Sequence, residues 1–226
     1  IVEDKETGQR SQLLRRSYTA TSQGIKAFGS MVWAMAVSWG VRSARQVVVI
    51  GDGAEWIWKY TKERFYFEGV NGEAHKPIEI LDFYHACENL AKARDLIFAQ
   101  PDSAPAKKWY DYWRKRVRDG AVDELIAELK RREKRCDSPA RLQALQVRRG
   151  YFETHRGRMD YPRYESMNLP IGSGAIEGTC KHLIKGRMDC VGQRWDSTEG
   201  IENMAVLRTR IFNEKFDDLW EGQKIA

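Results

Sequence analysis

Three acidic residues occur where backbone elements are expected to begin or end. Asp52 follows the β-branched run QVVVI, and Asp82 follows the apolar run PIEIL. Active-site residues in open α/β sheets tend to lie just beyond the carboxyl ends of strands. Glu177 lies in GSGAIEG, where two glycines permit a tight turn before a predicted helix. Carboxylates that converge on one site suit Mg²⁺ or Mn²⁺, hard cations that prefer oxygen ligands.

Such a metal site would support phosphodiester chemistry. Two divalent cations about 4 Å apart can activate a water or a 3′-hydroxyl and stabilise the leaving oxygen. Each residue also has an ordinary interpretation. Asp52 could form a turn before Gly53, Asp82 could cap a helix, and Glu177 could be favoured by the positive end of a helix dipole. The spacing alone leaves both interpretations open.

The elements that would position these residues alternate between strands and helices in the first hundred residues. An order of strand, helix, strand, helix predicts an α/β fold with parallel neighbouring strands. The predicted elements are a weak strand at 13–19, a helix at 22–39, a strand at 46–50, a helix at 55–64, a strand at 77–81 and a helix at 84–98.

The pattern changes after Pro101. Residues 104–158 have helical periodicity and almost no strand signal, which predicts an all-helical segment lodged between two parts of the α/β domain. Helices are expected near 106–118, 122–135 and 139–150, then near 175–187 and 199–213, and a short segment at 216–220 closes the chain.

Basic residues are concentrated in this helical segment. Residues 107–158 contain 16 Lys and Arg against 8 Asp and Glu, a net charge of +8, whereas the whole chain has +6. Cations neutralise phosphates, and the interleaved aromatic rings can stack on unpaired bases, so the segment suits DNA. For any single cluster, the solvated face of an amphipathic helix is the favoured interpretation. The candidate DNA contacts are Arg114, Lys115, Arg116, Arg131, Arg132, Lys181, Arg187 and Arg194.

Composition excludes several other classes of protein. With 42% hydrophobic and 11% aromatic residues, the chain is not expected to be disordered or collagen-like. No apolar run approaches 18 residues and no signal peptide opens the chain, so no membrane partner is expected. Four cysteines in 226 residues do not make a disulfide framework, which favours a reducing cytoplasm.

Two other kinds of site find less support in the residues. His85 and Cys87 form one potential zinc-ligand pair and Cys180 and His182 another, but one-residue spacers are unusual for structural zinc. We expect His85 to form hydrogen bonds beside the active site instead. Ser173 lies between glycines but lacks the strand–turn–helix context of a nucleophile elbow.

Four motifs occur together in a specific order: GDGAEWIW, ILDFYHACENL, GSGAIEGTCKHLIKGRM and WDSTEGIENMAVLR. In this order they resemble the bacterial insertion-sequence DDE transposases of the Mutator-like branch, and the resemblance covers about 22–220. It implies a ribonuclease-H-like mixed sheet with helices, interrupted by an all-α insertion. It also implies metal-dependent DNA strand cleavage and strand transfer by a homodimer or larger assembly bound to transposon ends and target DNA.

The resemblance assigns roles residue by residue. Asp52 matches the second catalytic aspartate and Glu177 the final glutamate, and these two would hold the metal ions. Asp82 and His85 match a paired Asp-x-x-His signature that organises the site, so Asp82 is not taken as a metal ligand. The implied organisation is a first part of the catalytic core at 1–100, the basic helical insertion at 101–165, and the C-terminal core helices with the glutamate at 166–226.

The chain departs from the family pattern at its start. The family's first catalytic aspartate lies on the first strand, well before the helix expected at 22–39. Asp4 is the only aspartate there, and its surroundings are too polar for a central strand. We therefore expect the first aspartate and the first two strands to be missing, and the chain not to cleave DNA unaided. The alternatives are a non-catalytic DNA-binding transposase remnant and a ribonuclease-H-like nuclease outside transposition.

Overall fold

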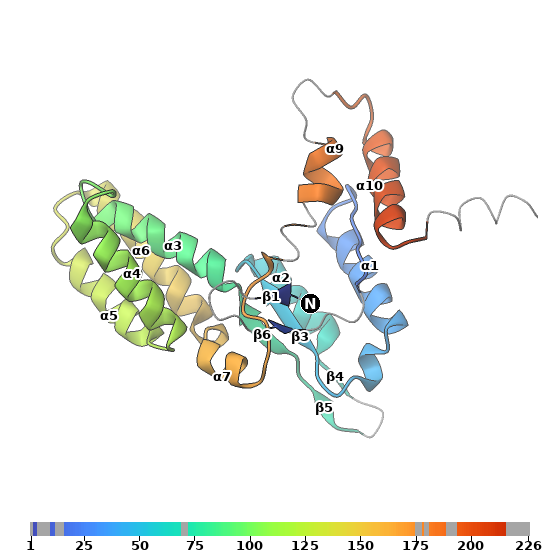
Figure 1. The fold of residues 1–226 in the computed structure, drawn as a ribbon, viewed down its shortest axis with the longest axis horizontal. Coiled ribbons are helices and arrows are strands. Elements are labelled where there is room, and N and C mark those ends of the chain that lie inside the picture. Colours follow the sequence, from blue (N-terminus) through green and yellow to red (C-terminus); the bar gives the residue numbers. More distant parts are fainter. Residues whose placement is uncertain are drawn as a thin grey trace, which may run out of the picture. The chain divides into compact units, whose positions relative to one another are not determined.

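A computed structural model describes most of the chain (Figure 1). The described residues are 2–3, 10–11, 16–68, 72–174, 178, 181–188 and 194–215. They form a mixed α/β protein that is mostly helical and has a small sheet of few strands, which confirms the α/β class. Contacts divide the chain into two compact units. The first unit comprises Ile1–Val47, Lys62–Lys76 and Gly174–Ala226, and the second comprises Val48–Thr61 and Pro77–Ser173.

Two parallel strands lie in the second unit. β3 (Val48–Gly51) pairs with β6 (Ile78–Leu81), and Gly51 lies opposite Leu81 at the carboxyl ends of both. Ile80 and Leu81 are fully buried, as expected for a short β-branched and apolar strand within a core. Both strands were predicted from their apolar runs, and their parallel pairing agrees with the predicted α/β order.

Helices make up the rest of the second unit, and their boundaries follow sequence signals. A proline occupies the first turn of three of them, where its missing N–H costs nothing. The helix predicted to end at Gly150 continues to His155 because Phe152 and His155 are buried on its inner face. The elements are α3 (Phe83–Ile97), α4 (Ala104–Arg118), α5 (Val122–Glu133), α6 (Pro139–His155), η2 (Arg156–Arg158) and α7 (Tyr161–Ser166).

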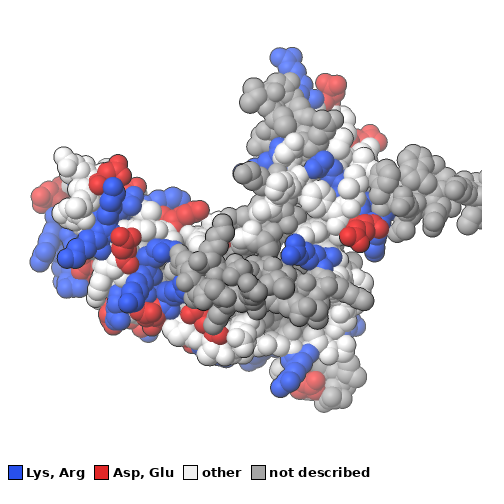
Figure 2. Space-filling view, in the orientation of Figure 1, with Lys and Arg blue, Asp and Glu red and all other residues white. Residues whose placement is uncertain are grey.

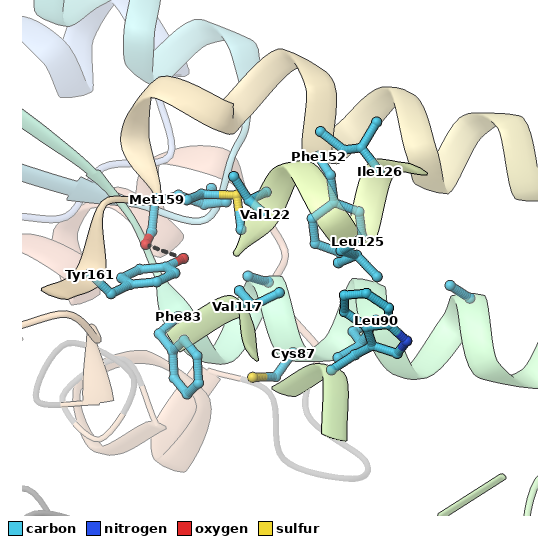
Figure 3. Close-up of a cluster of buried hydrophobic side chains, with 14 of the residues drawn as sticks. Phe83, Cys87, Leu90, Val117, Val122, Leu125, Ile126, Phe152, Met159 and Tyr161 are labelled. Atoms are coloured by element: carbon cyan, nitrogen blue, oxygen red, sulfur yellow. Dashed lines mark hydrogen bonds between the residues drawn. The ribbon is translucent and has the colours of Figure 1, made fainter. Parts of the chain in front are cut away.

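One hydrophobic core joins these helices to the parallel strands. On α4 the buried side chains recur at three- and four-residue steps, at Ala106, Trp109, Trp113 and Val117. Of these, Trp109, Trp113 and Val117 pack with residues of β6, α3, α5, α6 and α7 in a continuous cluster (Figure 3). The segment expected as an insertion therefore shares its core with β3 and β6. The domain boundaries at 100/101 and 165/166 stay a prediction, because the compact units divide the chain at other positions.

Helices and short antiparallel strands form the first unit. β4 (Phe67–Glu68) pairs with β5 (Ala74–His75), and the Phe67 and His75 rings stack at 4.7 Å between centroids. α2 (Glu55–Phe65) begins in the second unit and ends in this one. The other elements are β1 (Val2–Glu3), β2 (Arg10–Ser11), α1 (Ile25–Ser38), η1 (Val41–Ser43), η3 (Lys181–Lys185), α9 (Gly186–Met188) and α10 (Thr198–Phe212).

The weak strand predicted at 13–19 is wrong for its described part. Residues 16–19 form no strand, because the backbone of Tyr18 is paired with a side chain instead. Asn213 accepts a hydrogen bond from the Tyr18 N–H (2.8 Å) and donates one to the Tyr18 carbonyl (2.9 Å). Glu202 of α10 also accepts from the Ser22 N–H (2.6 Å) and from the Thr21 hydroxyl (2.8 Å). The predicted segment 216–220 lies outside the described residues.

Among the helices that the structure describes, none combines the length and the apolar character needed to cross a bilayer.

Candidate active site at the ends of two parallel strands

The register of β3 and β6 brings Asp52 and Asp82 together. The backbone N–H of Asp82 donates to the carbonyl of Gly51 at 2.8 Å, which continues the ladder by one residue. Neighbouring strands lie about 4.8 Å apart, so the backbones of the two aspartates adjoin at one edge of the sheet. The prediction that both residues end strands is thus confirmed, and the two strands are hydrogen-bonded neighbours.

Asp82 is fully buried and all its hydrogen bonds hold backbone segments in place. Its Oδ1 accepts from the backbone N–H groups of Tyr84 (2.7 Å) and His85 (3.2 Å), which caps the first turn of α3. Its Oδ2 accepts from the backbone N–H of Ser173 (2.6 Å) and from the Ser173 hydroxyl. The predicted helix cap is therefore present. With both oxygens occupied by protein donors, this carboxylate is poorly placed to bind a metal ion.

Asp52 differs from Asp82 in both exposure and partners. Its side chain is exposed, and Oδ1 accepts from the Ala54 N–H at 2.9 Å in a tight turn. Gly53 follows with φ of 99°, a left-handed conformation that favours glycine. Within the described residues no hydrogen bond reaches Oδ2 of Asp52. That oxygen is therefore available to a cation or to a polar group of a substrate.

Helix α6 packs directly against this turn. The Tyr151 hydroxyl donates to the Asp52 carbonyl at 3.2 Å. A Cβ added at Gly53 would lie 2.9 Å from Cε2 of Tyr151 and 3.1 Å from Nε2 of His155, so glycine is needed for this close approach. The two rings contact each other with centroids 4.8 Å apart. The last turn of α6 therefore fixes the position of the turn that contains Asp52.

Both of these α6 side chains are uncharged at neutral pH. Burial, followed by the negative charges of Asp52 and Asp82, raises the pKa of Tyr151 above its ordinary range. Burial and then Arg158 lower the pKa of His155, and a backbone hydrogen bond with Gly53 opposes this shift. Tyr151 and His155 thus position the turn without adding charge to it.

His85 lies at the start of α3, and its ring is close to the Asp82 carboxylate but not within hydrogen-bond distance. Its Nδ1 is 3.6 Å from Oδ1 of Asp82, and its side chain is 28% exposed. Two hydrogen bonds connect the His85 backbone to α6. Arg148 of α6 donates to Oδ1 of Asn89 at 2.8 Å, and Nδ2 of Asn89 donates to the His85 carbonyl at 3.1 Å. This chain of hydrogen bonds holds the first turn of α3 against α6.

Sequence reasoning missed four residues of this arrangement: Asn89, Arg148, Tyr151 and His155. Tyr151 and His155 are four apart, as expected for one face of a helix, but the predicted helix ended at Gly150 and its next turn was left out. Arg148 lies in the basic helical segment, but its role depends on a partner 59 positions away.

Several of the predicted DNA contacts are engaged in ion pairs. Arg116 pairs with Glu124, and Arg131 and Arg132 both pair with Glu128. Figure 2 shows the consequence, since acidic side chains are interspersed among the basic ones on the helical part of the surface. These ion pairs are the ordinary interpretation of a basic helix face, and they reduce the charge offered to DNA.

The remaining candidates differ in how they are placed. Lys115 is exposed and forms no ion pair within the described residues, whereas the Arg114 guanidinium lies 5.6 Å from the centre of the Phe83 ring. Arg194 is exposed in the first unit. Lys181 and Arg187 lie in helical backbone, and their side chains fall outside the described part, as does the whole of Glu177.

No group of three or more His, Cys, Asp or Glu residues able to hold a metal ion occurs among the described residues. The described donor set fits a hard cation only in part, because Asp52 supplies one free carboxylate oxygen and Asp82 supplies none. The first pair weighed for zinc, His85 and Cys87, lies within the described residues. In the second pair, Cys180 lies outside them.

Comparisons of the chain with models of protein families, with curated protein sequences and with solved structures found no match. The family assignment therefore stays a prediction from the ordered sequence motifs.

Proposed function

We propose that this chain is the catalytic domain of a DDE transposase with a ribonuclease-H-like fold. In this proposal it contributes Asp52 and Glu177 to the cleavage of DNA strands at the ends of an insertion sequence and to their joining to target DNA. The observation that carries the proposal is the adjacency of Asp52 and Asp82 at the carboxyl ends of two parallel strands. One of these carboxylates is exposed and partly free, as a metal ligand must be, and its neighbour is buried and structural.

The hydrogen bonds of Asp82 support the further roles that the motifs imply. Asp82 anchors Ser173, and Glu177 follows only four residues later in the sequence. The buried aspartate of ILDFYHACENL thus holds the start of GSGAIEG, whose second residue is Ser173. This gives a physical reason for the two motifs to occur in one chain.

Asp52 and Glu177 would hold Mg²⁺ or Mn²⁺ in this proposal. The ions, when bound, would activate a water or a 3′-hydroxyl and stabilise the leaving oxygen of the phosphodiester. The protein's own contribution is positional: Tyr151 and His155 fix the Asp52 turn, and Asp82 fixes both the first turn of α3 and Ser173.

A non-catalytic DNA-binding remnant is the second candidate. The observation that favours it is that only one carboxylate oxygen of the aspartate pair is free of protein donors in the described structure. A remnant would keep the fold and the basic helical surface but would bind no catalytic metal.

The two candidates differ in how DNA binding depends on metal. The test uses labelled duplexes that carry the terminal sequences of the element encoding the chain, with and without Mn²⁺. For the transposase domain we expect tighter binding in Mn²⁺, lost in both Asp52→Asn and Glu177→Gln but kept in Asp111→Asn, which alters an exposed aspartate on α4. A remnant would bind equally in both conditions. Joining of the labelled ends to a target plasmid separates a transposase from a nuclease outside transposition.

A further inference from the structure

Arg148 is a half-buried cation on the inner face of α6. It comes three residues after Leu145 and four before Phe152, which are both buried, so the three side chains share one face of the helix. Arginine is rarely buried unless its charge is paired. The partner of Arg148 is therefore informative about what this position does.

That partner is a neutral side chain. Nη1 of Arg148 donates to Oδ1 of Asn89 at 2.8 Å, and Arg148 forms no ion pair within the described residues. Glu88, next to Asn89 in the sequence, is exposed to solvent. The arginines that follow on α6 and η2 are all paired with carboxylates: Arg149 with Glu133 and Glu153, Arg156 with Asp123, and Arg158 with Glu79.

The charge of Arg148 lies next to the candidate active site. Tyr151 follows one turn later on α6, and its hydroxyl donates to the Asp52 carbonyl at 3.2 Å. Residues three apart on a helix have Cβ atoms about 5–6 Å apart. Arg148 is therefore one helical turn from the contact between α6 and the turn that contains Asp52.

The guanidinium keeps donors for a further ligand. It has five N–H groups, and within the described structure Asn89 engages one of its nitrogens. The other nitrogens of Arg148 do not occur among the buried polar atoms without a partner, so they are accessible to solvent. An anion with two oxygens in one plane matches this planar fork, whereas a neutral ligand would leave the charge unpaired.

We propose that Arg148 binds a backbone phosphate of the DNA strand that occupies the candidate active site. The inference rests on the proposed function, because it takes DNA to be the substrate at Asp52. The hydrogen bond to Asn89 orients the guanidinium without neutralising it, so the charge stays available to the phosphate.

The test measures how DNA binding depends on salt. Each neutralised phosphate of duplex DNA adds about 0.9 to the steepness of log K against log salt concentration. Fluorescence anisotropy with labelled duplexes of the element's terminal sequences, in Mn²⁺ and at several NaCl concentrations, gives this slope. Arg148→Met removes the charge and keeps an unbranched side chain. We expect it to reduce the slope by about 0.9 and to weaken binding about tenfold at low salt, the range of one hydrogen bond to a charged group.

Two further variants separate the charge of Arg148 from its structural contact. Arg148→Lys keeps the charge but loses the fork, so the slope should stay the same while the affinity falls. Asn89→Asp keeps the acceptor and gives Arg148 a carboxylate partner, so it should reduce the slope as Arg148→Met does. Circular dichroism checks that each variant is folded.

Arg141→Met is the matched control. Arg141 is an exposed arginine in the first turn of α6 and forms no ion pair within the described residues. It comes seven residues before Arg148, about 10 Å further from the Asp52 turn along the helix. Its substitution should leave the slope unchanged.

The outcomes separate this inference from the proposed function. An unchanged slope in folded Arg148→Met or folded Asn89→Asp would show that Arg148 only joins α6 to α3. An equal reduction in Arg141→Met would assign the effect to the general charge of the helix. Either result overturns the inference, while DNA binding that still requires Mn²⁺ and Asp52 leaves the proposed function in place. Failure of the unmodified chain to bind the duplex contradicts both.

Discussion

Ser173 donates two hydrogen bonds, from its backbone N–H and its hydroxyl, to the same carboxylate oxygen of fully buried Asp82. The two residues are 91 positions apart in the sequence. The other oxygen of Asp82 caps α3, so one side chain fixes the start of a helix and the start of GSGAIEG. This relationship assigns Asp82 a structural role.

Asp82→Asn should therefore destabilise the fold. An asparagine keeps the helix-capping oxygen but replaces the other acceptor with an amide donor that faces the Ser173 N–H. We expect a loss of about 2–3 kcal/mol in the free energy of unfolding, the range for hydrogen bonds to a charged group. Urea denaturation followed by circular dichroism measures it, and Ser173→Ala should cost less because only the hydroxyl donor is lost. Unchanged stability together with lost Mn²⁺ binding would instead make Asp82 a metal ligand.

Gly53→Ala should be one of the more damaging small substitutions in the second unit. Its φ of 99° is unfavourable for alanine, and the new Cβ would lie 2.9 Å from the Tyr151 ring. We expect a cost of about 1–3 kcal/mol, measured by urea denaturation. Gly150→Ala is the control, since Gly150 lies within α6 with no atom within 4 Å of an added Cβ. It should be stabilising by up to about 1 kcal/mol. Equal changes in the free energy of unfolding at the two glycines would show that α6 does not pack closely against the Asp52 turn.

Stability should decline at alkaline pH partly through Tyr161. Its ring is fully buried, its hydroxyl donates to the Leu81 carbonyl at 3.1 Å, and burial raises its pKa well above the ordinary value of 10.0. Below pH 10 both states keep the proton, so this contribution to stability is complete. Above pH 10 the unfolded state releases a proton that the folded state retains, and stability falls with rising pH until the folded pKa is reached.

The Tyr161→Phe variant checks this effect. It should be about 1 kcal/mol less stable at pH 8, because the hydrogen bond to Leu81 is lost. Between pH 10 and pH 11 its stability should fall less steeply than that of the unmodified chain, as measured by urea denaturation at each pH. Parallel curves would mean that Tyr161 ionises as easily in the folded protein as in the unfolded one.

In the first unit, Asn213 should be more important than its position just after α10 suggests. Its side chain pairs with both backbone groups of Tyr18. Asn213→Asp keeps the acceptor for the Tyr18 N–H but loses the donor to the Tyr18 carbonyl, so it should be less harmful than Asn213→Ala. Hydrogen exchange of the Tyr18 amide should accelerate in Asn213→Ala and much less in Asn213→Asp. Equal exchange in all three proteins would contradict this pairing.

The elements could be predicted from sequence where the pattern was local. The runs QVVVI and PIEIL predicted the strands observed as β3 and β6. Helical periodicity, seen in the three- and four-residue steps of Trp109, Trp113 and Val117, predicted α4. The predicted end of α6 at Gly150 was wrong, because the helix continues through Phe152 and His155, which are buried.

The site was only partly predictable for a related reason. That Asp52 and Asp82 both end strands can be read from their neighbours in sequence. Which of the two carboxylates is free for a cation depends on Ser173, whose contact with Asp82 spans 91 positions. The contact that positions the Asp52 turn, from Tyr151, spans 99 positions. A single sequence contains no signal for such distant contacts.

Binding of Mn²⁺ tests the central claim most directly. Mn²⁺ would be titrated into the chain in the presence of DNA and the free ion followed by electron paramagnetic resonance. We expect saturable binding that weakens at least about tenfold in Asp52→Asn, the effect of losing one charged ligand worth about 1.4 kcal/mol or more. Asp111→Asn should bind as the unmodified chain does. Undiminished Mn²⁺ binding by a folded Asp52→Asn variant would contradict the assignment of Asp52 as a metal ligand and the transposase site built on it.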